Sequence, residues 1–395
     1  MTGYLIRRFF QMVLVVFLSA VVSYALLNLA PGGPLAGLGQ ATQSSKFRIT
    51  EEDIARIREY FELDLNLPLR FTRWFIGQPR GPLTIGGNEY FGDLVVGCRI
   101  PMEARDSEGN AKVVGCKENV TLKDLVGRRV SNGVIMGDFG LSWTTNRGRP
   151  VSELLISRLP NTIKLLLIAL VISLVIGIPL GIYSAVKQYS SFDYFFTTMA
   201  FMGSAMPTFF FGILMILFLS VLPKMGGLPY LPPGSSEAVR EYGIPWFGTI
   251  QAGSFADQIL HLIMPVTVLV FVSVSGWSRF IRASMLDVLR QDYVRTARAK
   301  GLTERVVIIR HALRNALIPF VTIIVFSLPG LFGGALITET VFSWPGMGRL
   351  YVQSLGNYDY PVNMAILFIT AVLTVIATLL RDILYTVVDP RIRFS

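Results

Sequence analysis

The chain has 395 residues, of which 52% are hydrophobic and 16% are charged, and its net charge is +10. Soluble globular proteins carry about 25% charged residues, and disordered chains are much poorer in apolar residues. The composition therefore excludes a disordered chain and disfavours a soluble enzyme, and the absence of a heptad pattern or a glycine period excludes a coiled coil or collagen. It indicates a protein that crosses a membrane several times.

Six stretches of at least 21 residues contain no Asp, Glu, Lys or Arg. A helix of roughly 20 apolar residues crosses the hydrocarbon core of a bilayer, whereas barrel strands would be about 10 residues long and alternating. We expect the first stretch to be a membrane helix rather than a signal peptide, because its apolar run exceeds the 7–15 residues of a signal core. In chain order, the predicted spans are Phe9–Ala30, Leu165–Val186, Tyr194–Pro223, Gln258–Ser278, Asn315–Thr338 and Tyr360–Leu380.

The short loops predict the orientation of these spans. The termini and the loops that lie on the same side as them carry 15 Lys or Arg and 6 Asp or Glu, whereas loops 224–257 and 339–359 carry 3 basic and 5 acidic residues. Because basic loops stay in the cytoplasm, we expect both termini to be cytoplasmic. The expected organisation is a first helix (1–30), an extracytoplasmic domain (31–160) and a core domain (161–395).

Several spans contain proline, which removes a backbone donor and can kink a helix. Two interpretations stay open: ordinary kinks with close helix packing, or a bundle that opens and closes around a path. The prolines in question are Pro179, Pro207, Pro319 and Pro329.

The chain lacks the residues that other membrane functions need. None of its eight lysines follows a glycine, so it has no phosphate-binding loop of the G-x-x-x-x-G-K type. Ion-driven carriers place ionisable residues inside their spans, but here the predicted spans hold only His261, expected to be a packing or interfacial residue. We therefore expect no catalytic residue, no metal site and no cofactor in this chain.

Both cysteines lie in the extracytoplasmic segment, at Cys98 and Cys116. An oxidising exterior permits a disulfide between them, although free thiols stay possible. The same region has Val- and Ile-rich pieces at Asp93–Val96 and Lys112–Val114, so residues 79–136 are expected to form a small β-rich insertion.

The most informative segment is the cytoplasmic loop 279–314, which carries nine basic and three acidic residues. Residues 282–299 contain no Gly or Pro and are expected to be helical, with Gly301 ending the helix. A second short helix is expected over 306–313, broken by Asn315 and Pro319. Nucleic-acid binding is disfavoured for a loop tied to the membrane at both ends, which leaves contact with lipid headgroups or docking of a cytoplasmic protein.

The docking interpretation depends on small residues that let a partner approach the backbone, with apolar anchors beside them. The small residues are Ala297, Ala299 and Gly301, and the anchors are Leu302, Val306 and Val307.

Residues 292–305 and 310–319 resemble the cytoplasmic "EAA" loop of bacterial ABC importer permeases, in particular the B-type subunit of the oligopeptide and dipeptide branch. Only Ala297 and Gly301 match the general Glu-Ala-Ala-x-x-x-Gly pattern, and its later proline is replaced by Arg314. Segment 79–136 is also longer than in the family. The other segments that resemble it are Tyr4-Leu-Ile-Arg-Arg, Leu29-Ala-Pro-Gly-Gly, Gly137-Asp-Phe-Gly-Leu-Ser, Arg149-Pro-Val-Ser-Glu-Leu, Arg158-Leu-Pro-Asn-Thr, Met206-Pro-Thr-Phe and Glu339-Thr-Val-Phe-Ser-Trp-Pro-Gly-Met-Gly-Arg349.

The resemblance implies an all-α permease of the type I ABC importer fold, with six membrane helices and an α+β extracytoplasmic insertion, in a bacterial or archaeal cytoplasmic membrane. It implies pairing with a second permease, two cytoplasmic ATPases that bind ATP and Mg, and an external binding protein that delivers peptides. Spans two to six would line the path. The residues expected to couple it to the ATPases are Asp292, Tyr293, Arg295, Ala297, Arg298, Gly301, Leu302 and Arg305.

Other functions stay open at this stage. The same branch includes importers of nickel complexes, glutathione and sugars. A self-sufficient channel or carrier is the next alternative, and an intramembrane enzyme is the most distant one.

Overall fold

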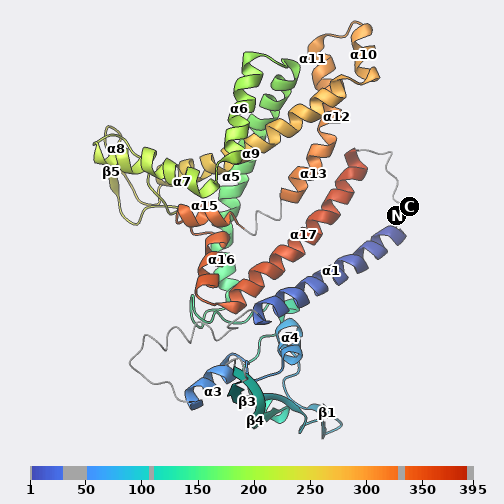
Figure 1. The fold of residues 1–395 in the computed structure, drawn as a ribbon, viewed down its shortest axis with the longest axis vertical. Coiled ribbons are helices and arrows are strands. Elements are labelled where there is room, and N and C mark those ends of the chain that lie inside the picture. Colours follow the sequence, from blue (N-terminus) through green and yellow to red (C-terminus); the bar gives the residue numbers. More distant parts are fainter. Residues whose placement is uncertain (1, 30–50, 106–110, 328–333, 389–395) are drawn as a thin grey trace. The chain divides into compact units, whose positions relative to one another are not determined.

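The computed structural model describes residues 2–29, 51–105, 111–327 and 334–388. Within these residues the chain is mostly helical and has three two-stranded antiparallel sheets (Figure 1). Contacts divide it into two compact units. One unit comprises residues 1–12, 157–352 and 369–395, and the other comprises residues 13–156 and 353–368.

Five of the described helices are long and apolar enough to cross a membrane. Four predicted spans lie in single long helices, so a multi-pass helical membrane protein is confirmed. The helices extend beyond the apolar runs. Helix α5 begins at Val151, before its run, and α9 continues past its run to Leu289. The four helices are α1 (Thr2–Leu29), α5 (Val151–Val186), α9 (Phe255–Leu289) and α17 (Tyr360–Val388).

The third predicted span is divided into two helices. Helix α6 (Ser191–Ala205) ends before Met206, and α7 (Thr208–Ile216) begins after Pro207, which caps it. Proline lacks an N–H group and pushes the residue before it into an extended conformation. The path then continues through the π-helical turn η4 (Leu217–Val221) into α8 (Leu222–Met225). The interruption expected at Pro207 is therefore present, and the apolar helix is Thr208–Met225.

The fifth predicted span is described only in part. It contains α12 (Arg314–Ala316) and α13 (Ile318–Ser327). Pro319 lies in the first turn of α13, where its missing N–H costs little. Pro329 lies outside the described residues.

Helix α5 is unbroken through Pro179. A Cβ atom on Gly181 would lie 2.7 Å from the backbone oxygen of Ser278 in α9. The glycine thus allows α5 and α9 to approach closely, which favours the packing interpretation for this part of the span.

The other unit carries the β-rich part of the chain, as predicted. Strands β3 (Val95–Arg105) and β4 (Ala111–Thr121) pair antiparallel, and a disulfide joins Cys98 to Cys116 with 5.9 Å between their Cα atoms. The side chains buried beside these strands are Leu65, Val96, Val120, Leu122 and Leu125. The remaining elements of this region are α3 (Glu51–Tyr60), α4 (Leu67–Ile76), β1 (Leu83–Ile85), β2 (Asn88–Tyr90), η2 (Lys123–Leu125) and η3 (Val134–Met136).

Candidate functional site

Loop 279–314 forms a helical hairpin rather than one long helix. Helix α9 ends at Leu289, and α10 (Asp292–Ala299) begins after Gln291, whose backbone is extended. The prediction of a single helix over 282–299 is therefore wrong. The turn lets the apolar face of α10 fold back onto the end of α9, which a continuous helix would leave in water.

Gly301 ends α10 as predicted. Its φ angle is +78°, and it donates a backbone hydrogen bond to Arg298, while Leu302 donates to Ala297. This pair of bonds is the Schellman arrangement, which needs a left-handed residue at the C′ position. A Cβ atom on Gly301 would meet no other atom within 4 Å, so the backbone conformation alone selects glycine there.

The inner face of α10 forms a small core of its own. Val294 and Ala297 are buried against Val307, with Val288 and Leu289 beside them. Ala297 and Val307 are therefore not available to a partner in this conformation, which corrects their expected role as partner-facing residues. Their burial instead fixes the position of α10 on the loop.

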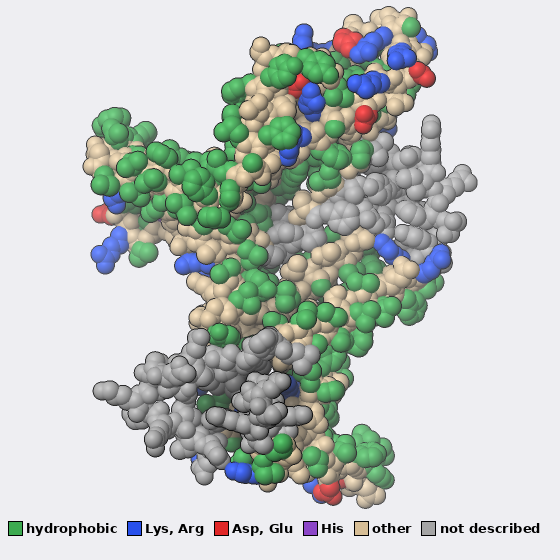
Figure 2. Space-filling view, viewed as in Figure 1, with side chains coloured by type: hydrophobic (Ala, Val, Ile, Leu, Met, Phe, Trp, Pro, Cys, Tyr) green, Lys and Arg blue, Asp and Glu red, His purple; other side chains and the backbone are tan. Residues whose placement is uncertain are grey.

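The outer face of α10 and the turn after it is exposed, and Figure 2 shows Lys and Arg side chains gathered over α10 and α11 (Glu304–Val306). Arg298 holds Glu304 through two hydrogen bonds of 3.1 and 2.7 Å. This guanidinium lowers the pKa of the Glu304 carboxyl. The residues that were predicted to couple the chain to the ATPases and that lie on the exposed face are Asp292, Tyr293, Arg295, Arg298, Gly301, Leu302 and Arg305.

The second half of the hairpin is longer than predicted. The π-helix η5 (Val307–Leu313) follows α11 and continues through α12 towards α13. Asn315 does not break this path, because its side-chain amide donates to the main-chain oxygen of His311 and to the hydroxyl of Tyr293. Asn315 therefore ties α12 to α10.

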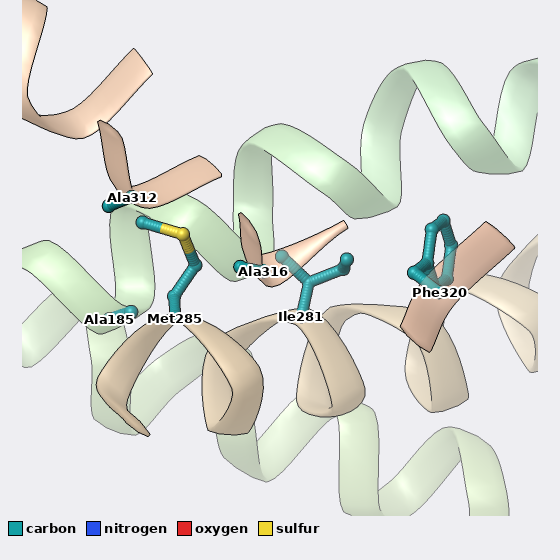
Figure 3. Close-up of a cluster of buried hydrophobic side chains, with 6 residues drawn as sticks. All are labelled: Ala185, Ile281, Met285, Ala312, Ala316 and Phe320. Atoms are coloured by element: carbon teal, nitrogen blue, oxygen red, sulfur yellow. The ribbon is translucent and has the colours of Figure 1, made fainter. Parts of the chain in front are cut away.

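Behind the hairpin, a buried apolar cluster connects it to the membrane helices (Figure 3). The cluster takes side chains from α5, α9, η5, α12 and α13, so these elements pack against one another. Its members are Ala185, Ile281, Met285, Ala312, Ala316 and Phe320.

A buried ion pair lies beside this cluster. Asp193, in the first turn of α6, accepts hydrogen bonds of 2.8 Å from both Nε and Nη2 of Arg282 in α9. It also accepts from the hydroxyl of Ser184 in α5 and from the backbone N–H of Tyr189. Hydrogen bonding to Arg282 in particular keeps the pKa of the Asp193 carboxyl well below its usual range. The pair thus joins α5, α6 and α9.

A second buried carboxylate organises the chain between α13 and α17. Glu339, in α15 (Leu336–Val341), accepts hydrogen bonds from the hydroxyl of Thr162 in α5 (2.9 Å) and from the backbone N–H of Arg349 (3.0 Å). A Cβ atom on Gly346 would lie 2.5 Å from the Glu339 carboxylate, so glycine leaves room for it. This contact brings together two of the segments quoted for the family resemblance.

In the other unit, Asp359 plays a similar part. This buried residue precedes α17 and accepts hydrogen bonds from the hydroxyl of Ser142 and from the backbone N–H groups of Trp143 (3.0 Å) and Thr145 (2.9 Å). Several backbone donors pointing at one carboxylate make a stable anion site. The carboxylate therefore fixes the loop that follows the Gly137-Asp-Phe-Gly-Leu-Ser segment.

Residues 177–394 match the family described as "Binding-protein-dependent transport system inner membrane component". The chain belongs to this family. It is a multi-pass membrane permease subunit with the type I ABC importer permease fold, and so a transport component.

Three curated relatives illustrate the similarity. The permease is 45% identical over 262 residues to the oligopeptide transport system permease protein AppB of Bacillus subtilis, which covers 66% of this chain and 78% of AppB. It is 39% identical over 269 residues to the dipeptide transport system permease protein DppB of Escherichia coli K12, with the same coverage. It is 30% identical over 391 residues, 99% of each chain, to the probable peptide ABC transporter permease protein y4tP of Sinorhizobium fredii.

Sequence reasoning missed the polar contacts that stabilise the permease. One signal was available: Ser190 and Asp193 have the spacing of a capping box, and Ser190 does accept from the Asp193 backbone N–H at 3.2 Å. The pairing of Asp193 with Arg282 spans 89 positions in the sequence, and that of Thr162 with Glu339 spans 177. No local pattern predicts either contact.

Proposed function

We propose that this chain is one of the two permease subunits of an ATP-driven importer of peptides. It pairs with a second, related permease, and an external binding protein delivers the substrate. Family membership supports the binding-protein-dependent class, and similarity to the oligopeptide permease AppB and the dipeptide permease DppB supports oligopeptides or dipeptides as substrates. Two cytoplasmic ATPases supply the ATP site and Mg, and this chain binds neither.

The main support for the proposal is the position of α10. Its outer face is exposed, and its inner face is buried and continuous with the membrane helices. A partner that docks on the outer face can move α10 only together with the core below it, since packed cores transmit displacement rather than absorb it. Leu302 offers an apolar anchor, and Arg295 and Arg305 offer exposed positive charge.

The proposed cycle follows from this connection. ATP binding closes the ATPase pair and moves α10, and the displacement passes through the apolar cluster and the Asp193–Arg282 pair to α5, α6 and α9. Alternating access by such rigid-body motion needs no ion relay inside the spans. The break at Pro207 gives α6 and α7 a place to change their relative angle. The roles of Pro179, Pro319 and Pro329 as kink or gating positions stay predictions, and α5 is unbroken through Pro179.

The proposed orientation places loop 279–314 and both termini in the cytoplasm and residues 31–164 outside. The distribution of Lys and Arg supports it. An oxidising exterior also suits the disulfide between Cys98 and Cys116.

Gly301→Arg tests the docking role. The new side chain enters open space but adds a bulky cation to the docking face and strains the left-handed backbone by about 1–2 kcal/mol. We expect normal membrane insertion, with ATP hydrolysis no longer coupled to uptake in the reconstituted importer. Gly301→Asn, which tolerates the left-handed conformation, should keep most of the uptake.

The matched control is Gly127→Arg. Gly127 has a φ angle of +80° and equally open surroundings, but it lies in the extracytoplasmic segment. It should leave coupling intact. Normal uptake by Gly301→Arg, or an equal loss in both arginine variants, would contradict a docking role for α10.

A further inference from the structure

The unit formed by residues 13–156 and 353–368 contains a cavity of about 480 Å³. Tyr24 and Asn28, at the end of the first candidate membrane span, line one side. Tyr360 and Met364, at the start of the last candidate span, line another. Because both candidate spans end at these residues, we expect the cavity to lie at the level of the lipid headgroups.

Helix α4, which also lines the cavity, has the composition of an interfacial helix. Its aromatic side chains pack on the membrane helices, with ring-centre distances of 5.4 Å between Phe71 and Tyr24 and 5.7 Å between Phe75 and Phe17. Its other prominent side chains are Arg and Trp. Short helices with aromatic and basic faces lie in the boundary between hydrocarbon and headgroups.

Two donors of α4 that line the cavity have no acceptor among the described residues. The Nε atom of Arg70 and the indole Nε1 of Trp74 are buried and make no hydrogen bond in the described part of the chain. The two residues are four positions apart and therefore lie on the same face of α4. Trp74 also contacts the ring of Tyr24, with 5.2 Å between centres. Buried donors of this kind need an acceptor.

The acidic side chains around the cavity already have partners. Glu62 accepts from Arg73 at 3.0 Å, and Glu59 lies 3.6 Å from Arg128. Asp138, the third acidic residue in the lining, accepts from the backbone N–H groups at positions 132 (2.8 Å) and 140 (3.0 Å). None of the three is paired with Arg70.

Arg129, in the same lining, likewise forms no ion pair among the described residues. The lining thus contains four arginines and three acidic residues, next to an aromatic wall.

We propose that this cavity binds the phosphate group of an outer-leaflet phospholipid, with the guanidinium of Arg70 and the indole N–H of Trp74 as donors. A phosphate offers several strong acceptor oxygens to such a pair. Aromatic residues suit the apolar stem of a lipid that enters from the membrane boundary. The bound lipid would fix the extracytoplasmic domain to the membrane surface. The proposal rests on the membrane orientation given under the proposed function and not on the transported substrate.

The test is a titration of the full-length chain in detergent with short-chain phosphatidylglycerol, followed by native mass spectrometry. Arg70→Gln and Trp74→Phe should each weaken binding, and Arg70→Gln should weaken it at least about tenfold, as expected for a lost charge-assisted hydrogen bond. Arg56→Gln is the matched control, because Arg56 is exposed on the same domain and does not line the cavity. It should bind like the wild type.

Two further arms identify the source of the anion. Inorganic phosphate should compete only weakly, because it lacks the apolar stem, and a short peptide with a free carboxylate should not compete. Equal binding by the wild type and Arg70→Gln would overturn the site. Competition by inorganic phosphate as strong as that by the lipid would overturn the lipid assignment, as would Arg70-dependent binding of the peptide without lipid binding. Unchanged elution of each variant as a single species verifies its fold.

Discussion

Asp193→Asn removes the charge that Arg282 pairs with and leaves a guanidinium among the ends of α5, α6 and α9. Breaking a fully buried ion pair costs about 3–5 kcal/mol. The Arg282 side chain is 25% exposed, so water can partly solvate it after the change. We therefore expect a loss of about 2–3 kcal/mol in the free energy of unfolding. The asparagine oxygen still accepts one of the original hydrogen bonds, which also limits the loss.

A double-mutant cycle with Arg282→Gln measures the pair directly. Denaturant unfolding in detergent gives the free energy for the wild type, both single variants and the double variant. We expect the loss in the free energy of unfolding of the double variant to be smaller than the sum of the two single losses by at least about 1 kcal/mol, because the two residues are in contact. Losses that add to within about 0.5 kcal/mol would refute the pairing.

The same pair predicts a pH dependence. The pKa of Asp193 is lowered in the folded state, so its contribution to stability is fully present above the unfolded value of about 3.9. It is lost as the pH falls below that value towards the folded pKa. Asp193→Asn should remove this part of the acid sensitivity. An unchanged acid profile would show that another carboxyl dominates.

The other predictions concern packing and covalent structure. Glu339→Gln places an amide donor against groups that already donate, and should lower the free energy of unfolding by about 1–3 kcal/mol. An unchanged free energy of unfolding would contradict the hydrogen bonds assigned to Glu339. Gly181→Ala should destabilise by about 1–3 kcal/mol because its Cβ meets α9, whereas Gly276→Ala, with open space, should not; similar unfolding curves for the two would contradict close packing. Maleimide should label Cys98 and Cys116 only after reduction, and a mass shift beforehand would exclude the disulfide.

The membrane helices could be predicted because their signal is local. Phe9–Ala30 and Tyr360–Leu380 have apolar runs that set their length, and Pro207 lies at the break between α6 and α7. The left-handed Gly301 was predictable for the same reason, since a helix end favours glycine there. In each case a few neighbouring residues determine the structure.

The contacts that hold the candidate site could not be predicted in this way. The turn at Gln291 occurs because Val294 and Ala297 bury themselves against Val307, which lies beyond the next turn. From the sequence alone, the small size of Ala297 suited a docking face equally well. Whether such a side chain is buried or faces a partner depends on how distant segments pack, and the sequence pattern of one loop does not contain that information.

The Nε donor of Arg70, which has no acceptor among the described residues, is another feature that the sequence does not predict. The sequence shows a basic and aromatic segment but not which arginines find partners. Arg73 is buried and pairs with Glu62, whereas Arg70, three residues earlier, makes no such pair in the described structure. Only the three-dimensional arrangement separates the two.

The central claim is that this chain moves substrate only as part of an ATP-driven assembly. The most direct measurement is peptide uptake into vesicles that contain this chain, with and without the second permease, the ATPases, the binding protein and ATP. We expect uptake only when all of these are present, and co-purification of the ATPases with the chain in mild detergent. Uptake by the purified chain alone, without ATP, would contradict the account.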